Sequence, residues 1–296
     1  MGASITRKPD WLKVRLAGSG NYFHVSGILK EKGLHTICQS ARCPNIGACW
    51  ERRTATFLIL GDVCTRNCGF CAVAKGRPLP PDPAEPDSLA EASAALGLRY
   101  VVVTSVTRDD LADGGAGSFA ATIKAVKAKS LGTLVEVLIP DFQGDPDALE
   151  TVLAAGPDVL NHNLEAALSV YPRINRPPEN YRRSLRVLGR AAAAGALTKS
   201  GLMVGLGESE ADIERAMEDL LGAGCSLLTI GQYLRPTAVN PPVERYYTPQ
   251  EFERLARRAR RLGFAAVASG PLVRSSYEAE RLYHEARGRL GQTCAT

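Results

Sequence analysis

Short apolar runs alternate with longer amphipathic stretches along most of the chain. Six strand-like runs lie at residues 55–60, 99–105, 134–139, 158–163, 197–204 and 227–234. Stretches with apolar side chains at helical spacing follow them, at 87–96, 120–129, 147–154, 181–194, 211–221 and 249–261. Strands that alternate with helices form a parallel sheet covered by helices, so the pattern predicts an α/β fold of six strand–helix units.

Six units are fewer than the eight that close a TIM-type barrel, so we expect a partial (β/α)6 barrel with an open side. Function in such barrels collects at the C-terminal ends of the strands. Polar or glycine-rich stretches stand at all six ends: 64–71, 104–110, 140–141, 161–163, 205–208 and 232–235. We expect three regions, namely an N-terminal extension (1–54), the barrel (55–270) and a C-terminal extension (271–296).

The first of these stretches reads Cys64-Thr-Arg-Asn-Cys68-Gly-Phe-Cys71. Three thiolates on one short loop can hold three corners of an iron–sulfur cube, and no fourth cysteine follows at ligand spacing. One iron would stay open to a substrate, whereas a structural metal site closes itself with four protein ligands. Structural zinc is the alternative, but the nearest histidines, His24 and His35, lie well upstream.

A second cysteine group, Cys38, Cys43 and Cys49, lies just upstream with C-x4-C-x5-C spacing. Turn formers between these cysteines let the backbone fold around a cluster with three sulfurs pointing inward. Disulfides are not expected, because a chain of 296 residues buries a full core without them. The chain also shows no signal peptide, and clustered cysteines in a cytosolic chain favour metal.

The loop at 64–71 resembles the cysteine motif of radical S-adenosylmethionine (SAM) enzymes, in which an aromatic residue, here Phe70, precedes the last cysteine. Two adjacent three-cysteine groups, with the segments 8–13 (KPDWLK) and 271–277 (PLVRSSY), resemble the lipoyl synthases. This resemblance implies SAM and two [4Fe-4S] clusters. The ligands it implies are Cys64, Cys68 and Cys71 for the SAM-cleaving cluster, and Cys38, Cys43, Cys49 and Ser276 for an auxiliary cluster.

The activity implied by the resemblance is insertion of sulfur at C6 and C8 of an octanoyl group linked to a lysine of a carrier domain. SAM at the open iron would yield a 5'-deoxyadenosyl radical that removes hydrogen, and the auxiliary cluster would be consumed as the sulfur source. Implied partners are octanoylated lipoyl carrier domains (2-oxoacid dehydrogenase E2 subunits and the glycine cleavage H protein), an electron donor such as flavodoxin or ferredoxin, and an iron–sulfur carrier that rebuilds the spent cluster. The expected location is the cytoplasm.

Further cofactor contacts follow from the same resemblance. The segment 201–208 (GLMVGLGE) is similar to the G-x-I-x-G-x-x-E segment of radical SAM enzymes, which implies that Met203 packs near the adenine. The other candidate cofactor-binding residues are Phe70, Asn161, Asn163 and Glu208. Simple core packing remains open for Met203, and Glu208 could instead cap the helix that begins near Ser209.

Three more residue types have ordinary structural interpretations. Ser275 or Ser276, placed shortly before Glu278, has the pattern of a helix N-cap. His162 has the character of a satisfied core histidine, and we assign it no proton-transfer role. Cys225 and Cys294 are isolated and by default a small buried hydrophobe and an exposed thiol.

Composition adds modest limits. Thirty-six basic and 31 acidic side chains give a net charge of +5, well short of a nucleic-acid binder with a clustered basic stripe. The sequence contains no run of about eighteen apolar residues, which a membrane-spanning helix requires. Neither nucleic acid nor membrane is therefore an expected partner. The arginines at 254–261 fall at helical spacing and predict a solvated helix face, with docking of an acidic carrier as the alternative. The myristoylation-like pattern at 1–6 is loose enough to arise by chance.

Two other functions stay open. A different radical SAM sulfur-inserting enzyme, such as a biotin synthase or a methylthiotransferase, would share the C-x3-C-x2-C loop but not both the upstream cysteines and the Arg-Ser-Ser-Tyr segment. A non-enzymatic scaffold stabilised by metal would bind a protein or nucleic acid. Iron and sulfide analysis separates the enzyme, which holds iron, from the scaffold, which would hold zinc.

Overall fold

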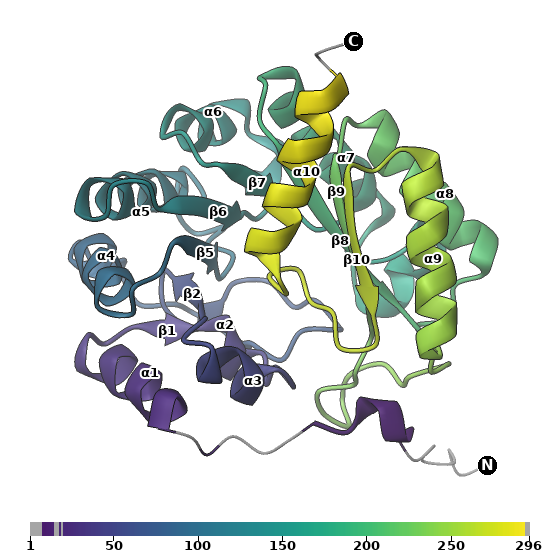
Figure 1. The fold of residues 1–296 in the computed structure, drawn as a ribbon, viewed down its shortest axis with the longest axis horizontal. Coiled ribbons are helices and arrows are strands. Elements are labelled where there is room, and N and C mark those ends of the chain that lie inside the picture. Colours follow the sequence, from purple (N-terminus) through teal and green to yellow (C-terminus); the bar gives the residue numbers. More distant parts are fainter. Residues whose placement is uncertain (1–7, 15–17, 19, 294–296) are drawn as a thin grey trace.

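The computed structural model describes residues 8–14, 18 and 20–293, and its centre is one twisted sheet (Figure 1). Seven strands of this sheet run parallel, and a short antiparallel strand, β1 (His35–Thr36), pairs with the first of them. The order is β1-β2-β5-β6-β7-β8-β9-β10, so β1 and β10 stand at the two ends. The parallel strands are β2 (Thr56–Ile59), β5 (Tyr100–Ser105), β6 (Leu134–Leu138), β7 (Val159–Asn161), β8 (Thr198–Val204), β9 (Leu227–Gln232) and β10 (Ala266–Gly270).

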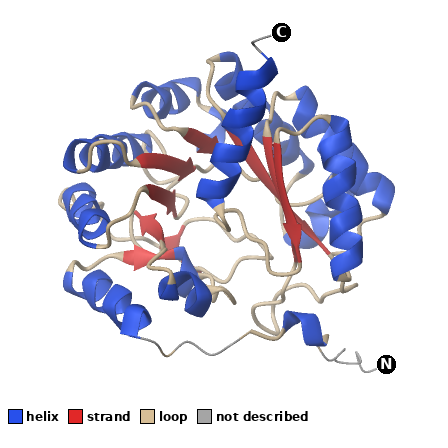
Figure 2. Ribbon diagram, viewed as in Figure 1, coloured by secondary structure: helices blue, strands red, loops and turns tan. Residues whose placement is uncertain are grey.

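Helices follow the strands along the chain and cover the outer face of the sheet, as Figure 2 shows. They are α4 (Glu85–Ala95), α5 (Ala116–Lys129), α6 (Pro146–Ala154), α7 (Pro178–Ala193), α8 (Glu210–Gly222) and α9 (Pro249–Leu262). Apolar strand residues that face outward pack against them, for example Val103 and Val137 against the α5 side chain Phe119. The predicted α/β barrel with six strand–helix units is confirmed.

The seventh parallel strand, β10, was not predicted. It pairs with β9 in parallel register, with Ala266 opposite Leu227 and Gly270 opposite Gly231. Its sequence is rich in alanine and glycine, which have low strand propensity, so the local pattern carries no clear strand signal. Pairing with β9 and packing of Ala266 and Ala268 against Leu282 and Ala286 stabilise this strand instead.

The barrel interior contains a buried ion pair. Lys199 Nζ lies 2.8 Å from Glu136 Oε1, and both side chains are 0% exposed. Tyr100 and Asn161 also donate hydrogen bonds to the Glu136 carboxylate, at 2.7 and 3.0 Å. Side chains alternate between the two faces of a strand, so these positions on β5, β6, β7 and β8 meet on the inward face. Pairing is what makes burial of these two charges tolerable.

The terminal regions add further helices. The N-terminal elements are η1 (Asp10–Leu12), α1 (Gly20–Glu31), α2 (Ile37–Ser40) and α3 (Ile46–Glu51), of which α1 contacts α4. The C-terminal helix α10 (Ala279–Thr293), yellow in Figure 1, crosses in front of the sheet and contacts β5 and β10. Its Leu282 and Ala286 pack on Leu227 and Ala266, so α10 covers the inward face near β10.

None of the helices in the described part of the chain has the length and apolar character needed to cross a membrane. Two features of the sequence, the pattern at residues 1–6 and Cys294, lie outside the described residues.

Candidate active site

The loop carrying Cys64, Cys68 and Cys71 follows β2 and is fastened by backbone contacts from distant elements. The Gly69 amide donates to the Ile174 carbonyl at 2.7 Å. A Cβ at Gly69 would lie 3.1 Å from the Ile174 backbone, so the approach favours glycine. Two side-chain amides hold the loop from outside: Asn240 donates to the Gly69 carbonyl and Asn175 to the Asn67 carbonyl, both at 2.7 Å.

Arg66, inside this loop, ties it to the ends of the neighbouring strands. Its guanidinium binds both carboxylate oxygens of Asp109, at 2.6 and 2.8 Å, and lies 2.7 Å from Asp141 Oδ1. Burial acts to raise the pKa of Asp141, but Arg66 outweighs it and holds that pKa well below its usual range. A bidentate guanidinium with two carboxylate partners fixes the loop as a rigid unit.

The three thiols of this loop are assembled in a largely buried site. Burial raises the pKa of Cys68, where Arg176 opposes the shift and Cys64 adds to it. Burial also raises the pKa of Cys71 to about 11, and the charges of Cys68 and Cys64 add to that shift. Cys64 Sγ accepts hydrogen bonds from the amides of Arg66 and Thr107, both at 3.4 Å. Thiols this close can serve one cluster, whose binding would displace their protons.

Two charged residues beside this loop were missed by the sequence analysis. Glu165 adopts a left-handed backbone conformation (φ 75°), held by hydrogen bonds with Gly201 and Met203 of β8 at 2.9 and 2.7 Å. Burial raises the pKa of its carboxyl, whereas Arg176 acts to lower it. Arg176 is only 8% exposed, its Nε has no hydrogen-bond partner, and its charge reaches Cys68.

The signals for these two residues differ. Glu165 lies two positions after the predicted polar stretch at 161–163. Extending that stretch by two residues would have included it. Arg176 comes just after the short helix η3 (Leu168–Ile174), and no local pattern marks it. Only the fold brings it beside the cysteine loop.

The remaining candidate cofactor residues lie on nearby elements. Phe70 and Met203 are partly buried against the same apolar cluster of the β8–β9 half. Asn161 is fully buried, and its Oδ1 has no hydrogen-bond partner. Glu208 accepts hydrogen bonds from the amides of Gly205 (2.5 Å) and Leu206 (2.9 Å) and so shapes its own turn. The helix-cap alternative for Glu208 is wrong, because Ser209 caps α8.

In the second cysteine set, Cys38 lies on α2, Cys49 lies on α3, and Cys43 lies in the turn between these helices. Burial raises the pKa of Cys38 to about 11 and also raises that of Cys49, and the charge of Cys43 adds to both shifts. The structure therefore brings these three thiols together as well. Seven cysteines fall within the described residues, and all seven are free thiols.

The C-terminal segment 271–278 packs directly on this second set. Asn45 Nδ2 donates to the Leu272 carbonyl at 2.6 Å. Thr56 Oγ1 donates to Ser276 Oγ at 2.8 Å, and the Thr56 backbone amide bonds to the Cys38 thiol. Helix α10 begins at Ala279, and the serine hydroxyls bond elsewhere, so the N-cap alternative for Ser275 or Ser276 is wrong. Thr56 thus joins Ser276 to the cysteine set.

The segment 271–278 passes so close to β9 that the strand needs a glycine at the point of contact. A Cβ at Gly231 would lie 2.1 Å from the Val273 carbonyl oxygen, a distance that real side chains do not reach. The segment therefore runs along the inward face of the barrel, where only a bare backbone leaves space.

Other predicted residues have structural roles. His162 is buried, with Nδ1 2.9 Å from the Ile139 carbonyl and Nε2 2.8 Å from Ser184 Oγ. Burial lowers its pKa to about 4, so it is a neutral core histidine, as the sequence suggested. Cys225 is likewise buried. On α9, Arg257 pairs with Glu253 on the exposed face, in agreement with a solvated helix.

The donor sets fit clusters in their chemistry. Within the described ranges, no three His, Cys, Asp or Glu side chains converge on a single metal ion. The thiolates of a cubane bind separate irons at its corners and need no such convergence. Each set has three mutually interacting thiols, and near the first set the buried Nε of Arg176 has no hydrogen-bond partner. An anionic cluster and a charged ligand would use such groups.

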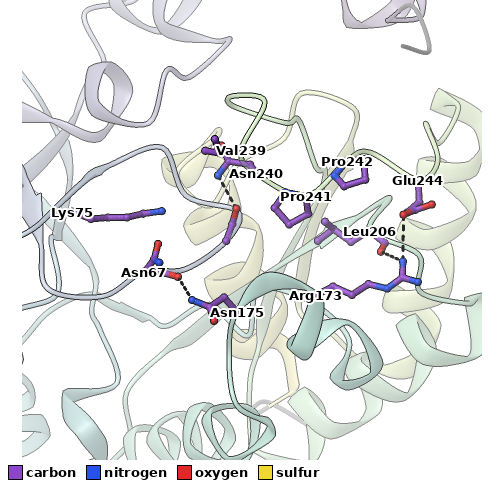
Figure 3. Close-up of a pocket in the computed structure, with 11 residues that line it drawn as sticks. Asn67, Lys75, Arg173, Asn175, Leu206, Val239, Asn240, Pro241, Pro242 and Glu244 are labelled. Carbon is purple, nitrogen blue, oxygen red and sulfur yellow. Dashed lines mark hydrogen bonds and ion pairs between the residues drawn. The ribbon is translucent and has the colours of Figure 1, made fainter. Parts of the chain in front are cut away.

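A cavity of about 730 Å³ borders the first cysteine loop (Figure 3). Asn67 and Gly69 of the loop form one side, and the loop after β9 forms another through Val239 and Asn240. Figure 3 shows Arg173 hydrogen-bonded to the Leu206 carbonyl and paired with Glu244 at the far side. The loop is therefore approachable from solvent on this side.

Comparison with known proteins places this site in a family. The profile of the Radical SAM superfamily matches residues 58–220. The lipoyl synthase of Symbiobacterium thermophilum is 53% identical over 98% of this chain and 93% of that protein. The lipoyl synthase of Rubrobacter xylanophilus is 54% identical over 96% of this chain and 89% of that protein.

A solved structure supports the fold. The FeFe-hydrogenase maturase HydG from Carboxydothermus hydrogenoformans superposes with a TM-score of 0.55 at 16% identity, over 77% of this chain and 56% of that one. This chain thus spans about half the length of HydG, and the likeness concerns the fold alone. On the strength of the sequence relatives and the radical SAM profile, the chain belongs to the lipoyl synthase family of the radical SAM superfamily.

Proposed function

We propose that this protein is a lipoyl synthase, which inserts two sulfur atoms at C6 and C8 of an octanoyl group linked to a lysine of a carrier domain. The observation that carries the proposal is the presence of two separate three-cysteine sets on one barrel, with Ser276 hydrogen-bonded beside the second. A single set would serve many radical SAM reactions. A second set, completed from the C-terminus, fits a reaction that also needs a sulfur source.

The first set has the role of the SAM-cleaving site. Cys64, Cys68 and Cys71 would hold three corners of a [4Fe-4S] cluster, leaving one iron for SAM. Arg176 and Glu165 offer opposite charges to the carboxylate and ammonium groups of SAM, and Arg176 has an unused donor for this purpose. Phe70 and Met203 offer an apolar surface to the adenine. When bound, the cluster and SAM supply a 5'-deoxyadenosyl radical that removes hydrogen from the substrate.

The second set has the role of the sulfur source. Cys38, Cys43 and Cys49 would hold three corners of an auxiliary [4Fe-4S] cluster, with Ser276 at the fourth. A serine oxygen is a harder and weaker ligand for iron than a thiolate, so this corner is the one suited to open. The Thr56 hydroxyl, 2.8 Å from Ser276 Oγ, orients that oxygen.

The substrate sets a positioning requirement. An alkyl chain has no polar handle near its reacting carbons, so apolar contacts must hold it at attack distance. We propose octanoylated lipoyl carrier domains as substrates, with a flavodoxin or ferredoxin as electron donor and an iron–sulfur carrier as the source of new clusters. The regions 1–54, 55–270 and 271–296 would then supply the auxiliary cysteines, the barrel and the serine ligand.

An anaerobic assay tests the function. The reconstituted protein is mixed with SAM, a reductant and an octanoyl-lysine peptide, and the mass of the peptide is measured by mass spectrometry. The expected product has gained two sulfur atoms and lost two hydrogens from the reacting carbons. An unmodified octanoyl peptide, under conditions in which SAM is cleaved, would refute the assignment in favour of another radical SAM reaction.

A further inference from the structure

The serine next to the proposed ligand is held from the opposite side of the barrel. Asn163 lies just beyond β7, and both atoms of its amide engage Ser275: Nδ2 donates to Ser275 Oγ at 2.7 Å, and the Ser275 hydroxyl donates to Oδ1 at 3.0 Å. These residues are separated by 112 positions in sequence. The contact is therefore a feature of the assembled fold.

The serine pair is thus fastened on two sides. Ser275 is held by Asn163 from β7, and the adjacent Ser276 is held by Thr56 from β2. The segment between β10 and α10 has no helix or strand of its own in the structure. Side-chain hydrogen bonds such as these are what fix a segment without a backbone ladder.

The surroundings of Asn163 hold its amide in one orientation. A Cβ at Gly201 would lie 2.7 Å from Asn163 Oδ1, so the glycine at this position leaves space for the amide. Asn163 also lies beside the Glu165 carboxyl, whose pKa it acts to lower, and the charge of Glu165 in turn raises the pKa values of Cys68 and Cys71. One side chain therefore contacts both the SAM side of the barrel and the segment that reaches the second cysteine set.

We propose that Asn163 is a positioning residue for the auxiliary-cluster ligand: through Ser275 it places Ser276 at the open corner of the Cys38, Cys43 and Cys49 set. Asn163 then acts on the sulfur-donating site rather than on SAM itself. This inference rests on the proposed function, because it assigns Ser276 the ligand role.

Three variants and a matched control test it. Asn163→Ala and Ser275→Ala each remove one side of the contact, and the double variant removes both. Ser93→Ala deletes a buried serine hydroxyl that bonds only the Leu89 carbonyl in α4, far from the site in sequence and fold. Each protein is reconstituted and assayed for thiolated octanoyl peptide and for 5'-deoxyadenosine. Hydrogen exchange of residues 271–278 is measured in the cluster-free chain.

The expected result is a specific pattern. Each single variant should lose about tenfold in thiolation, as expected for one lost hydrogen-bonding contact at a site that must be precise. The double variant should be no worse than Asn163→Ala, because Ser275→Ala deletes only a contact that Asn163→Ala has already removed. Cleavage of SAM should stay within about twofold of wild type in Ser275→Ala and fall in Asn163→Ala, which also loses its contact with Glu165. Residues 271–278 should exchange faster in both variants. Ser93→Ala should behave as wild type in all three readouts.

Other patterns would overturn the inference. If Ser275→Ala keeps full thiolation while Asn163→Ala loses thiolation and SAM cleavage together, Asn163 acts at the SAM site and not through Ser275. Unchanged thiolation in both single variants would also contradict the positioning role. If wild type itself fails to thiolate the peptide, the proposed function fails, and the exchange of residues 271–278 decides the inference alone: unchanged exchange in Asn163→Ala rejects it. Ser275→Ala carries the test if Asn163→Ala does not fold.

Discussion

The two cysteine sets are built in different ways. The loop with Cys64, Cys68 and Cys71 is fixed by the barrel itself, through Arg66 on strand ends and through Asn175 and Asn240 on later loops. The set at 38–49 sits on two short helices and the turn between them and is completed by residues 272–276 from the other end of the chain. One site is therefore part of the scaffold, and the other is assembled where the two terminal regions meet.

This difference matches the two chemical tasks that we propose for the sets. A site that generates a radical benefits from rigid, repeatable geometry, which strand ends provide. A site that gives up its own sulfur must be opened and refilled, and a corner held by a terminal segment is easier to release than one embedded in the sheet. The two sets should accordingly respond differently to the same kind of damage.

Loss of one thiol from each set gives the largest expected effect. Cys68→Ala should abolish SAM cleavage and thiolation together, whereas Cys43→Ala should retain SAM cleavage and lose thiolation. The reason is that each variant removes a cluster ligand from one set only. Both products, 5'-deoxyadenosine and thiolated peptide, are quantified by mass spectrometry, and exchanged phenotypes would break the assignment.

A substitution in the barrel interior should affect both cysteine sets equally, because both depend on the folded barrel. Glu136→Ala leaves Lys199 charged and unpaired at a site with no exposure, which should cost about 4 kcal/mol in the free energy of unfolding. Urea titration measures that cost, and iron analysis should show equal loss from both sets. A loss confined to one set would mean that the interior supports only that set.

Damage to the first loop's anchor should affect only the first set. Asp141→Ala removes one partner of Arg66 but leaves Asp109 in place, so we expect a smaller cost, about 3 kcal/mol in unfolding free energy. The folded pKa of Asp141 is depressed, so its contribution is present above about pH 4 and lost on further acidification. Urea titrations at neutral pH, compared with Asp145→Ala as an exposed control at the α6 N-cap, check the difference.

Acid should lower the stability of the barrel, because unfolding lets the buried His162 take up a proton. Its folded pKa of about 4 lies below the unfolded value of about 6.5, so the unfolded chain binds the proton more readily between these values. Stability from this residue is complete above about pH 6.5 and falls as the pH drops toward 4, by about 2 kcal/mol at pH 5. Urea titrations of the cluster-free chain should show this slope, and His162→Gln should flatten it. An equal slope in His162→Gln would assign it to another group.

The smallest expected effect concerns the C-terminal contact of the second set. Asn45→Ala removes the 2.6 Å hydrogen bond to the Leu272 carbonyl and should cost about 1 kcal/mol. Iron release to a chelator should become faster for the second set while SAM cleavage is unchanged. Faster iron release from the first set instead would show that the two sites are not independently held.

The sequence predicted the barrel well because strand and helix periodicities are local signals. It also found both cysteine sets, because their spacing is local too. It missed β10, whose small residues fit a crowded interior rather than a strand pattern. It missed Arg176, and the bonds of Asn163 to Ser275 and of Thr56 to Ser276, because these depend on segments that only the folded chain brings together. Periodicity has no access to such contacts.

The origin of the inserted sulfur tests the central claim most directly. The protein is reconstituted with sulfide of a heavy isotope, freed of unbound sulfide, and reacted once with SAM, reductant and octanoyl-lysine peptide. If the set at Cys38, Cys43 and Cys49 donates sulfur, the product contains heavy sulfur at both positions, and Cys43→Ala yields none. Product formed with light sulfur, or heavy product that persists in Cys43→Ala, would contradict the division of labour between the two sets.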